Sequence, residues 1–365
     1  MRHLGAQISD VGEDFLVVGR GLNEPVEVLD CGNSGTLIRL ICGVLAGQNF
    51  HSILTGDSSL RSRPMERVTV PLRLMGARID GRQQGRLAPL AVRGGNLTGI
   101  SYTLPVASAQ VKSALLLAGI FASGSTQVNE PIPTRDHTER IFRHFGIPVE
   151  QAEGVVHTEQ ASQFTGRDLV VPGDFSSAAF FIGAGLIVPG SDILIEGVGL
   201  NPTRTGLLAV LREMGADLSY QVTGGQESEP WGWIRARSSD LHGVEVRPDQ
   251  VTGMIDEIPV LAAVAAWAEG VTEIHGLAEL RVKESDRLAA ISANLTALGV
   301  EWEGGLDWIR IRGGRVHPGT VQAFGDHRMA MAFAVAGLPV GVKVLGAEWT
   351  AISFPEFFPT LEGLR

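Results

Sequence analysis

A short hydrophobic phrase around a glycine recurs five times along this chain, and its spacing limits the folds available to it. The phrases are MRHLGAQI (1–8), LRLMGARI (72–79), FRHFGIPV (142–149), LREMGADL (211–218) and LTALGVEW (295–302). Their glycines are separated by 71, 70, 69 and 84 residues. Such a period is too long for a solenoid repeat and suits a larger supersecondary unit. The chain is therefore expected to contain several copies of one α/β module.

A second feature, an apolar segment, recurs with about the same spacing as the glycine phrases. Ala/Leu-rich segments that begin at Asn, Ser or Asp and end at Gly, as helices do, occupy residues 31–47, 106–119, 172–185, 255–270 and 325–337. They are apolar all round, which predicts interior helices. Runs rich in β-forming residues follow at 52–56, 126–130, 192–198 and 272–276. Each module is thus predicted to contain a buried helix, a strand, a second helix ending in the phrase, and further strands.

The N-termini of the predicted buried helices indicate a function. If the modules are related by rotation, these helices are parallel, and their free N–H groups and positive dipole ends converge on one face. The chain as a whole is acidic, with a net charge of −10. A face of this kind in an acidic protein suits small anionic molecules.

The first module is predicted to be incomplete. The polar turn that opens a module precedes the glycine of its phrase by 43, 38, 39 and 43 residues in the four cases that can be measured. Gly5 would need a turn about 40 residues before Met1. Either a preceding segment is missing from this sequence, or the first module begins at its second helix.

Composition excludes several classes of protein. With 365 residues, 44% of them hydrophobic, the chain can form two domains with separate cores. The negative charge argues against nucleic-acid binding, and no apolar run of 18 residues or signal-peptide core occurs. Only two cysteines, Cys31 and Cys42, are present, so we expect a reducing compartment, the cytoplasm. No P-loop, dinucleotide-binding or HExxH motif occurs.

The most specific polar stretch is ELRVKESDRL (279–288). It places Arg281, Lys283, Glu284, Asp286 and Arg287 within seven residues, directly after a predicted strand. Basic groups beside a carboxylate can hold a phosphate and move a proton. Alternatively, such a run of charges has no function of this kind and only forms the solvated face of a helix.

Other charged residues lie at the predicted helix starts. Asp326, His327 and Arg328 form the cap and first turn of one helix, where an arginine is unfavourable for the helix dipole unless it faces an anion. The alternative is that these residues only cap the helix at the protein surface. Asp256 and Glu257 come just before an apolar helix, and the alternative to a functional role is that such a carboxylate is no more than an N-cap.

Two further arginines lie in predicted turns. Arg63 stands in a loop directly before Pro64, and Arg135 stands at the start of a helix whose cap is Thr134 or Asp136.

Four motifs together identify a family. RVKESDR (281–287), GDHRMAMAF (325–333), NSGTLIR (33–39) and SAQVKSALLLAG (108–119) resemble those of the EPSP synthases, and the resemblance extends to SFPEFFPTLEGL (353–364). It implies an α/β, two-domain enolpyruvyl transferase fold, in which each domain contains repeated βαβαββ modules with buried parallel helices. The helix N-termini would face an inter-domain cleft. We expect residues 1–173 to form the N-terminal domain, with modules 1 (partial), 2 and 3, and residues 174–365 the C-terminal domain, with modules 4–6.

The resemblance also implies a reaction. Phosphoenolpyruvate and shikimate 3-phosphate give 5-enolpyruvylshikimate 3-phosphate and phosphate, by addition and then elimination, on the route to chorismate and the aromatic amino acids. It implies no metal and no other cofactor, and we expect a monomer that binds neither nucleic acid nor membrane.

The resemblance assigns roles to individual residues. The residues implied in catalysis are Asp256, which would receive the 5-hydroxyl proton, Glu284, which would transfer a proton at C3, and Lys283, which would lie between the substrates. Those implied for phosphoenolpyruvate are Gly35, Arg63, Gln110, Arg287 and Arg328. Those implied for shikimate 3-phosphate are Ser108, Ala109, Gln110, Arg135, Asp256 and Lys283. Asn33, Asp326 and His327 would support the site.

Two alternatives remain open. The related UDP-N-acetylglucosamine enolpyruvyl transferases share the fold, but they carry a loop cysteine that the stretch TGDSSLRSRP (55–64) lacks. The other alternative is a catalytically impaired EPSP synthase fragment that binds anions without turnover. It is motivated by a family motif, Lys-Ser followed closely by Arg, that has no match here and would belong to the turn before Met1.

Overall fold

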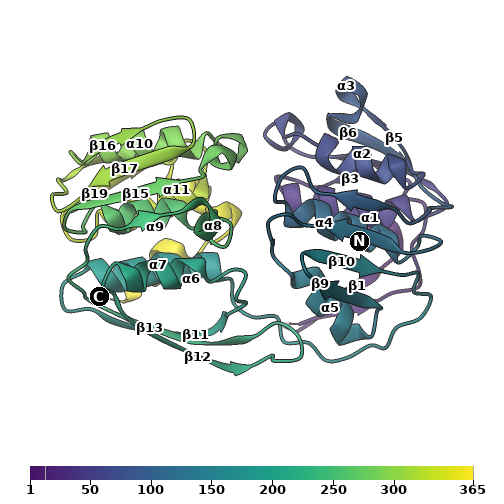
Figure 1. Cartoon of the computed structure of the whole chain (residues 1–365), viewed down its shortest axis with the longest axis horizontal. Coiled ribbons are helices and arrows are strands. Elements are labelled where there is room, and N and C mark those ends of the chain that lie inside the picture. The colour runs from purple at the N-terminus through teal and green to yellow at the C-terminus, as the bar shows by residue number, and fades with distance from the viewer. Residues whose placement is uncertain (13, 365) are drawn as a thin grey trace. The chain divides into compact units, whose positions relative to one another are not determined.

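Two compact units make up the chain. The computed structural model describes residues 1–12 and 14–364, and its internal contacts divide the chain into Met1–Asp168 and Leu169–Arg365 (Figure 1). Each unit has its own cluster of buried hydrophobic side chains.

The described residues of the first unit form two four-stranded sheets and one hairpin. Its strands are β1 (Gln7–Val11), β2 (Asp14–Val18), β3 (Leu29–Asp30), β4 (His51–Thr55), β5 (Arg78–Gly81), β6 (Leu87–Arg93), β7 (Ser101–Thr103), β8 (Thr126–Asn129), β9 (Val149–Ala152) and β10 (Val155–Thr158). Its helices are η1 (Arg2–Leu4), α1 (Gly35–Ala46), η2 (Leu60–Ser62), α2 (Glu66–Leu74), α3 (Arg82–Gly85), α4 (Ala109–Gly119) and α5 (His137–Phe145).

The second unit contains sheets of three, four and two strands. Its strands are β11 (Asp192–Gly199), β12 (Asp217–Gly224), β13 (Trp231–Arg237), β14 (Glu245–Val246), β15 (Val271–His275), β16 (Glu301–Gly304), β17 (Trp308–Arg312), β18 (Gly319–Gln322) and β19 (Val342–Leu345). Its helices are α6 (Phe175–Ile187), α7 (Gly206–Glu213), α8 (Pro248–Val251), α9 (Ile258–Ala265), η3 (Ala278–Val282), α10 (Arg287–Ala297), α11 (His327–Ala336), η4 (Ala347–Ile352) and α12 (Phe357–Gly363).

The predicted repeat is confirmed by the sheet topology. The strand orders β3-β4-β6-β5, β7-β8-β10-β9 and β14-β15-β17-β16 are the same pattern three times. In each sheet the first pair is parallel and the other two pairs are antiparallel. The order β11-β13-β12 repeats the last three positions, and Gly173 forms a parallel bridge to Val198 where the first strand would lie.

The glycine of every phrase has a left-handed or similar backbone conformation. The φ angles are +98° at Gly5, +110° at Gly76, +72° at Gly146, +91° at Gly215 and +69° at Gly299. Residues with a Cβ adopt such angles at a cost, so glycine is the usual residue where a helix stops and the chain turns into a strand. Gly5 ends η1 in the same way and leads into the β1–β2 hairpin.

The apolar helices are interior in the second unit and less so in the first. Nearly every residue of α6, α9 and α11 is buried, and each of these helices packs against the other two. The prediction is wrong for part of α1, where Leu37 is 47% exposed. Among the described residues α1 packs against one other apolar helix, α4, whereas α6, α9 and α11 each pack against two.

Within residues 1–12 and 14–364, no helix combines the length and apolarity that a membrane span requires.

Candidate active site

One guanidinium in the second unit is bonded to three carboxylates. Arg287 opens α10, whose N-cap is Asp286, with Oδ1 of Asp286 accepting the backbone N–H of Ala289 at 3.0 Å. The residues that share the Arg287 guanidinium are Asp326, bonded to Nε at 2.7 Å, Glu284, bonded to Nη2 at 2.6 Å, and Asp256, bonded to Nη1 at 3.3 Å. The Arg287 side chain is only 1% exposed. The run 281–287 is therefore not a solvated helix face, because its last arginine lies in the interior.

The charges of this cluster stabilise one another. Burial alone would lower the pKa of Arg287, but the carboxylates of Asp326, Glu284 and Asp256 outweigh it and raise that pKa. Burial would likewise raise the pKa of Asp326, and the Arg287 charge and hydrogen bond reverse the effect and lower it. The guanidinium and the carboxylate of Asp326 thus stay ionised across the physiological pH range.

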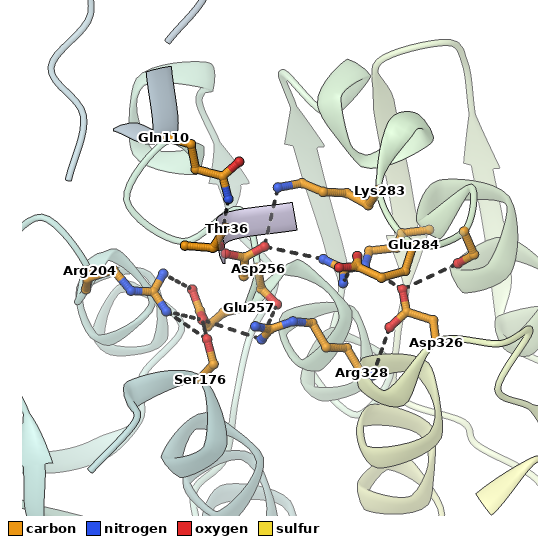
Figure 2. A network of polar contacts seen from close by, with 12 residues as sticks. Thr36, Gln110, Ser176, Arg204, Asp256, Glu257, Lys283, Glu284, Asp326 and Arg328 are labelled. Carbon is orange, nitrogen blue, oxygen red and sulfur yellow. Dashed lines mark hydrogen bonds and ion pairs between the residues drawn. The ribbon is translucent and has the colours of Figure 1, made fainter. Parts of the chain in front are cut away.

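Asp256 lies at the centre of the polar contacts. Its Oδ1 is 3.5 Å from Nζ of Lys283 in addition to its bond with Arg287, and its backbone carbonyl accepts a hydrogen bond from Nη1 of Arg328 at 3.2 Å (Figure 2). The helix α9 starts at Ile258, with Glu257 at the N-cap position and no side-chain capping bond. The hypothesis that Asp256 serves only as an N-cap is therefore wrong.

The start of α11 contributes the remaining predicted residues of this unit. Asp326 is the N-cap, since its Oδ1 accepts the backbone N–H of Arg328 at 2.9 Å. The Arg328 side chain is 17% exposed and reaches Asp256, so it is not a surface cap. Burial and the Arg328 charge lower the pKa of His327, which keeps its imidazole neutral at pH 7.

A second cluster in the first unit holds Arg63. Its Nη2 donates to Oδ1 of Asn33 at 2.8 Å, and Nδ2 of Asn33 donates to Oδ2 of Asp57 at 2.6 Å. Burial acts to raise the pKa of Asp57, but hydrogen bonds from Asn33 and from the Leu60 backbone, with the Arg63 charge, lower it. Asn33 is thereby fixed between a carboxylate and a guanidinium.

Gly35, the first residue of α1, lies close to two guanidinium groups. A Cβ at this position would be 2.9 Å from Nη1 of Arg39 and 3.2 Å from Nη1 of Arg63. Any larger side chain would push on both cations, so this position admits only the smallest residue without rearrangement.

The start of α4 carries three of the predicted residues. Ser108 occupies the N-cap position without a side-chain capping bond, and Ala109 is the first helical residue. Gln110 connects this helix to α1, because its Oε1 accepts from Nη1 of Arg39 at 2.7 Å. Its Nε2 also donates to Oγ1 of Thr36 at 2.8 Å (Figure 2). The N-termini of α1 and α4 therefore lie side by side, as the repeat predicts.

Arg135 lies between β8 and α5, flanked by the buried residues Thr134 and Asp136. Asp136 is at the N-cap position, but its carboxylate accepts from Nε of Arg140 at 2.9 Å rather than from the helix backbone.

Sequence reasoning missed several polar residues that the fold brings into these clusters. Arg39 contacts Gln110 and the carbonyl of Pro64. It is the one charged residue in the apolar segment 31–47, and this could have marked it in the sequence. Arg204, which bonds to Glu257, carries no such signal. Ser176, which also bonds to Glu257, was marked by the sequence only as part of a module's opening turn. No group of three or more potential metal ligands occurs in the described ranges.

Comparison with known proteins gives the family. Residues 1–361 match the sequence model of EPSP synthase, 3-phosphoshikimate 1-carboxyvinyltransferase. The 3-phosphoshikimate 1-carboxyvinyltransferase of Thermus thermophilus is 64% identical over 99% of this chain and 85% of that protein, and the one from Geobacter metallireducens is 51% identical over 99% and 86%. A solved EPSP synthase from Acinetobacter baumannii superposes with a TM-score of 0.87 at 41% identity, over 100% of this chain and 85% of that one. The fold and the aligned sequence thus define an enolpyruvyl transferase.

The chain belongs to the EPSP synthase family. The reaction of that family transfers the enolpyruvyl group of phosphoenolpyruvate to shikimate 3-phosphate, in the pathway to the aromatic amino acids. Of the two enolpyruvyl transferase hypotheses drawn from the sequence, the shikimate one is therefore confirmed.

Proposed function

We propose that the clusters described above perform the enolpyruvyl transfer of the family, from phosphoenolpyruvate to the 5-hydroxyl of shikimate 3-phosphate, with release of phosphate. The observation that carries this proposal is the buried guanidinium of Arg287, which bonds to both Asp256 and Glu284. Two carboxylates at fixed positions suit a reaction that removes one proton and adds another.

Asp256 and Glu284 are the proposed proton-transfer groups. Asp256 receives the proton of the 5-hydroxyl as that oxygen attacks C2 of the enolpyruvyl group, and Glu284 serves proton transfer at C3. Since both bond to Nη atoms of the same guanidinium, their separation is set by the rigid fork of Arg287.

Cations of the second unit are proposed to bind the anionic substrates. Lys283 and Arg328 each contact Asp256 and have side chains that are 28% and 17% exposed. Phosphoenolpyruvate carries a carboxylate and a phosphate, which planar guanidinium groups bind in bidentate fashion. We assign Arg287 and Arg328 to phosphoenolpyruvate, and Lys283 to a position between the two substrates.

Residues of the first unit are proposed to bind the anionic substrates through a helix N-terminus and through further guanidinium groups. Ser108, Ala109 and Gln110 form the start of α4, where free backbone N–H groups favour an anion. We assign these three to shikimate 3-phosphate, with Arg135 at its phosphate. Arg63 and Gln110 are assigned to phosphoenolpyruvate, and Gly35 allows close backbone approach there.

Supporting residues keep these groups in place. Asn33 orients Arg63, Asp326 orients Arg287, and the neutral His327 fills the buried start of α11 without adding a charge. We further propose that the protein acts as a cytoplasmic monomer that needs no metal, which sedimentation and assays in the presence of a chelator test.

The direct test is an assay of the purified chain with phosphoenolpyruvate and shikimate 3-phosphate, followed by phosphorus NMR. We expect phosphate and 5-enolpyruvylshikimate 3-phosphate to appear in equal amounts, and neither to appear when UDP-N-acetylglucosamine replaces shikimate 3-phosphate. Binding of both substrates by calorimetry without phosphate release would instead favour the hypothesis of an anion-binding chain without turnover.

A further inference from the structure

A buried ion pair at the start of α9 has no part in the roles assigned above. Glu257 accepts hydrogen bonds from both Nη atoms of Arg204, at 3.3 Å to Oε2 and 3.1 Å to Oε1 (Figure 2). Its Oε1 also accepts a hydrogen bond from Oγ of Ser176, and Nη2 of Arg204 donates to the same Oγ at 2.7 Å. Three side chains from three separate segments thus form a closed network.

This network is almost fully removed from water. The side chains of Glu257 and Arg204 are 0% and 9% exposed, and Ser176 is 2% exposed. A buried charge without its partner is strongly disfavoured, so the guanidinium of Arg204 and the carboxylate of Glu257 hold each other in one geometry. The network fastens the start of α9 to the start of α6 and to the turn before α7.

Glu257 also connects to two residues of the proposed reaction. It directly follows Asp256 in the chain, and its Oε1 lies 4.0 Å from Nη1 of Arg328. That same Nη1 atom donates to the backbone carbonyl of Asp256 at 3.2 Å. One carboxylate therefore stands between two guanidinium groups and reduces the repulsion between them.

We propose that Glu257 is a positioning residue for enolpyruvyl transfer, acting through Asp256 and Arg328. Its bonds to Arg204 and Ser176 fix the backbone that carries Asp256, and its charge keeps the guanidinium of Arg328 beside the Asp256 carbonyl. This inference rests on the proposed function of Asp256 and Arg328. The competing possibility is that the ion pair contributes only to stability.

Glu257→Gln is the central variant, because it keeps the size of the side chain and removes its charge. We expect kcat to fall by about 10- to 100-fold, since displacement of a reacting group by about 1 Å costs up to two orders of magnitude. KM for phosphoenolpyruvate should rise, because Arg328 loses its neighbouring charge. Both constants are measured well below the unfolding temperature of the variant, which circular dichroism gives. Arg204→Lys, which keeps the charge but not the two-pronged bond, should have an intermediate effect.

The matched control is Glu273→Gln. Glu273 lies on β15 of the same unit and pairs at 2.8 Å with Arg310, which is not a member of the network. Glu273→Gln should lower the unfolding temperature only slightly and leave kcat and KM unchanged. If Glu257→Gln behaves like this control, with unchanged kinetic constants, the pair acts on stability only and the positioning role is wrong.

Two measurements keep the test independent of other failures. Ser176→Ala removes one hydrogen bond and retains the ion pair, so it tests the network even if Glu257→Gln does not fold. A kcat equal to that of the wild type would then count against the proposal.

Crystal structures of the wild type and Glu257→Gln give a readout without activity. We expect Arg328 to leave the Asp256 carbonyl in the variant, and an unchanged contact would overturn the inference. An inactive wild type with an altered contact in the variant would refute the proposed function instead.

Discussion

Nε of Arg287 donates a hydrogen bond to Oδ2 of Asp326 at 2.7 Å, and both side chains are buried, at 1% and 0% exposure. Asp326 is at the same time the N-cap of α11, through the backbone N–H of Arg328. One carboxylate thus connects the first residue of α10 to the first turn of α11, and so joins two consecutive modules at the place where the proposed catalytic groups lie.

Asp326→Asn should destabilise the second unit by about 3–5 kcal/mol, because it leaves a buried guanidinium without its main partner. Urea denaturation at pH 7 measures this change. The pKa of Asp326 is lowered in the folded protein, so its contribution is present above the ordinary carboxyl pKa and is lost as the pH falls through the lower, folded value. The difference between wild type and variant should therefore shrink in strong acid. Asp192→Asn, which removes an exposed partner of Arg235, should change stability far less.

Glu284→Gln should reduce kcat by about 10²- to 10⁴-fold, the range expected when a positioned proton-transfer group is removed. The variant keeps a hydrogen-bond acceptor for Nη2 of Arg287, so circular dichroism should show a folded protein. Glu303→Gln, on the exposed strand β16, serves as the control and should retain full activity. A Glu284→Gln variant with near-normal turnover would contradict the assignment of Glu284 to proton transfer.

Lys112→Met should destabilise the first unit by about 3–5 kcal/mol. Nζ of Lys112 lies 3.0 Å from Glu130 and 2.5 Å from Glu139, with all three side chains at 0–1% exposure. Without the ammonium group, the buried carboxylates of Glu130 and Glu139 lose the positive charge that offsets their repulsion.

The same variant should have a distinctive pH dependence. Burial raises the pKa of Glu139 even though Lys112 acts to lower it, so removing Lys112 raises that pKa further. A carboxyl with a raised folded pKa destabilises the fold above that pKa, and the penalty disappears as the pH falls through it. The unfolding temperature of Lys112→Met should thus approach that of the wild type as the pH is lowered from the raised pKa of Glu139 towards the ordinary carboxyl pKa. Lys343→Met, on β19 in the other unit, should show no such convergence.

Gly76→Ala should cost about 1–2 kcal/mol, because φ is +110° there and a Cβ makes that angle unfavourable. Space is not the cause, since the nearest atom to a new Cβ is the Asn96 carbonyl oxygen at 3.5 Å. Gly146→Asn should cost clearly less, because φ is +72° and asparagine tolerates the left-handed region. Equal thermal stability of the two variants would contradict this explanation of the repeated glycines.

The repeat was readable in the sequence because its elements are set by local rules. Glycines, Asn, Ser or Asp residues and runs of β-forming residues predicted the order of helices and strands that the sheets confirm. The exact helix ends were predicted less well, since α6 continues past Gly185 to Ile187 and α9 has Glu257 at its N-cap position. The burial of α1 was predicted less well. Whether an apolar helix is covered on all sides depends on how many neighbours the tertiary structure supplies, and composition does not contain that number.

The residues of the candidate site divide in the same way. The charged motif at 281–287 and the turn at 326–328 stood out in the sequence as groups suited to anions and protons, and the comparisons fix the family to which they belong. Only the tertiary structure decided that Arg287 is buried among three carboxylates and that Glu257 bonds to Arg204 across 53 positions of the chain. Side-chain partners so distant in sequence are set by the packing of α6, α9, α10 and α11, which no local pattern specifies.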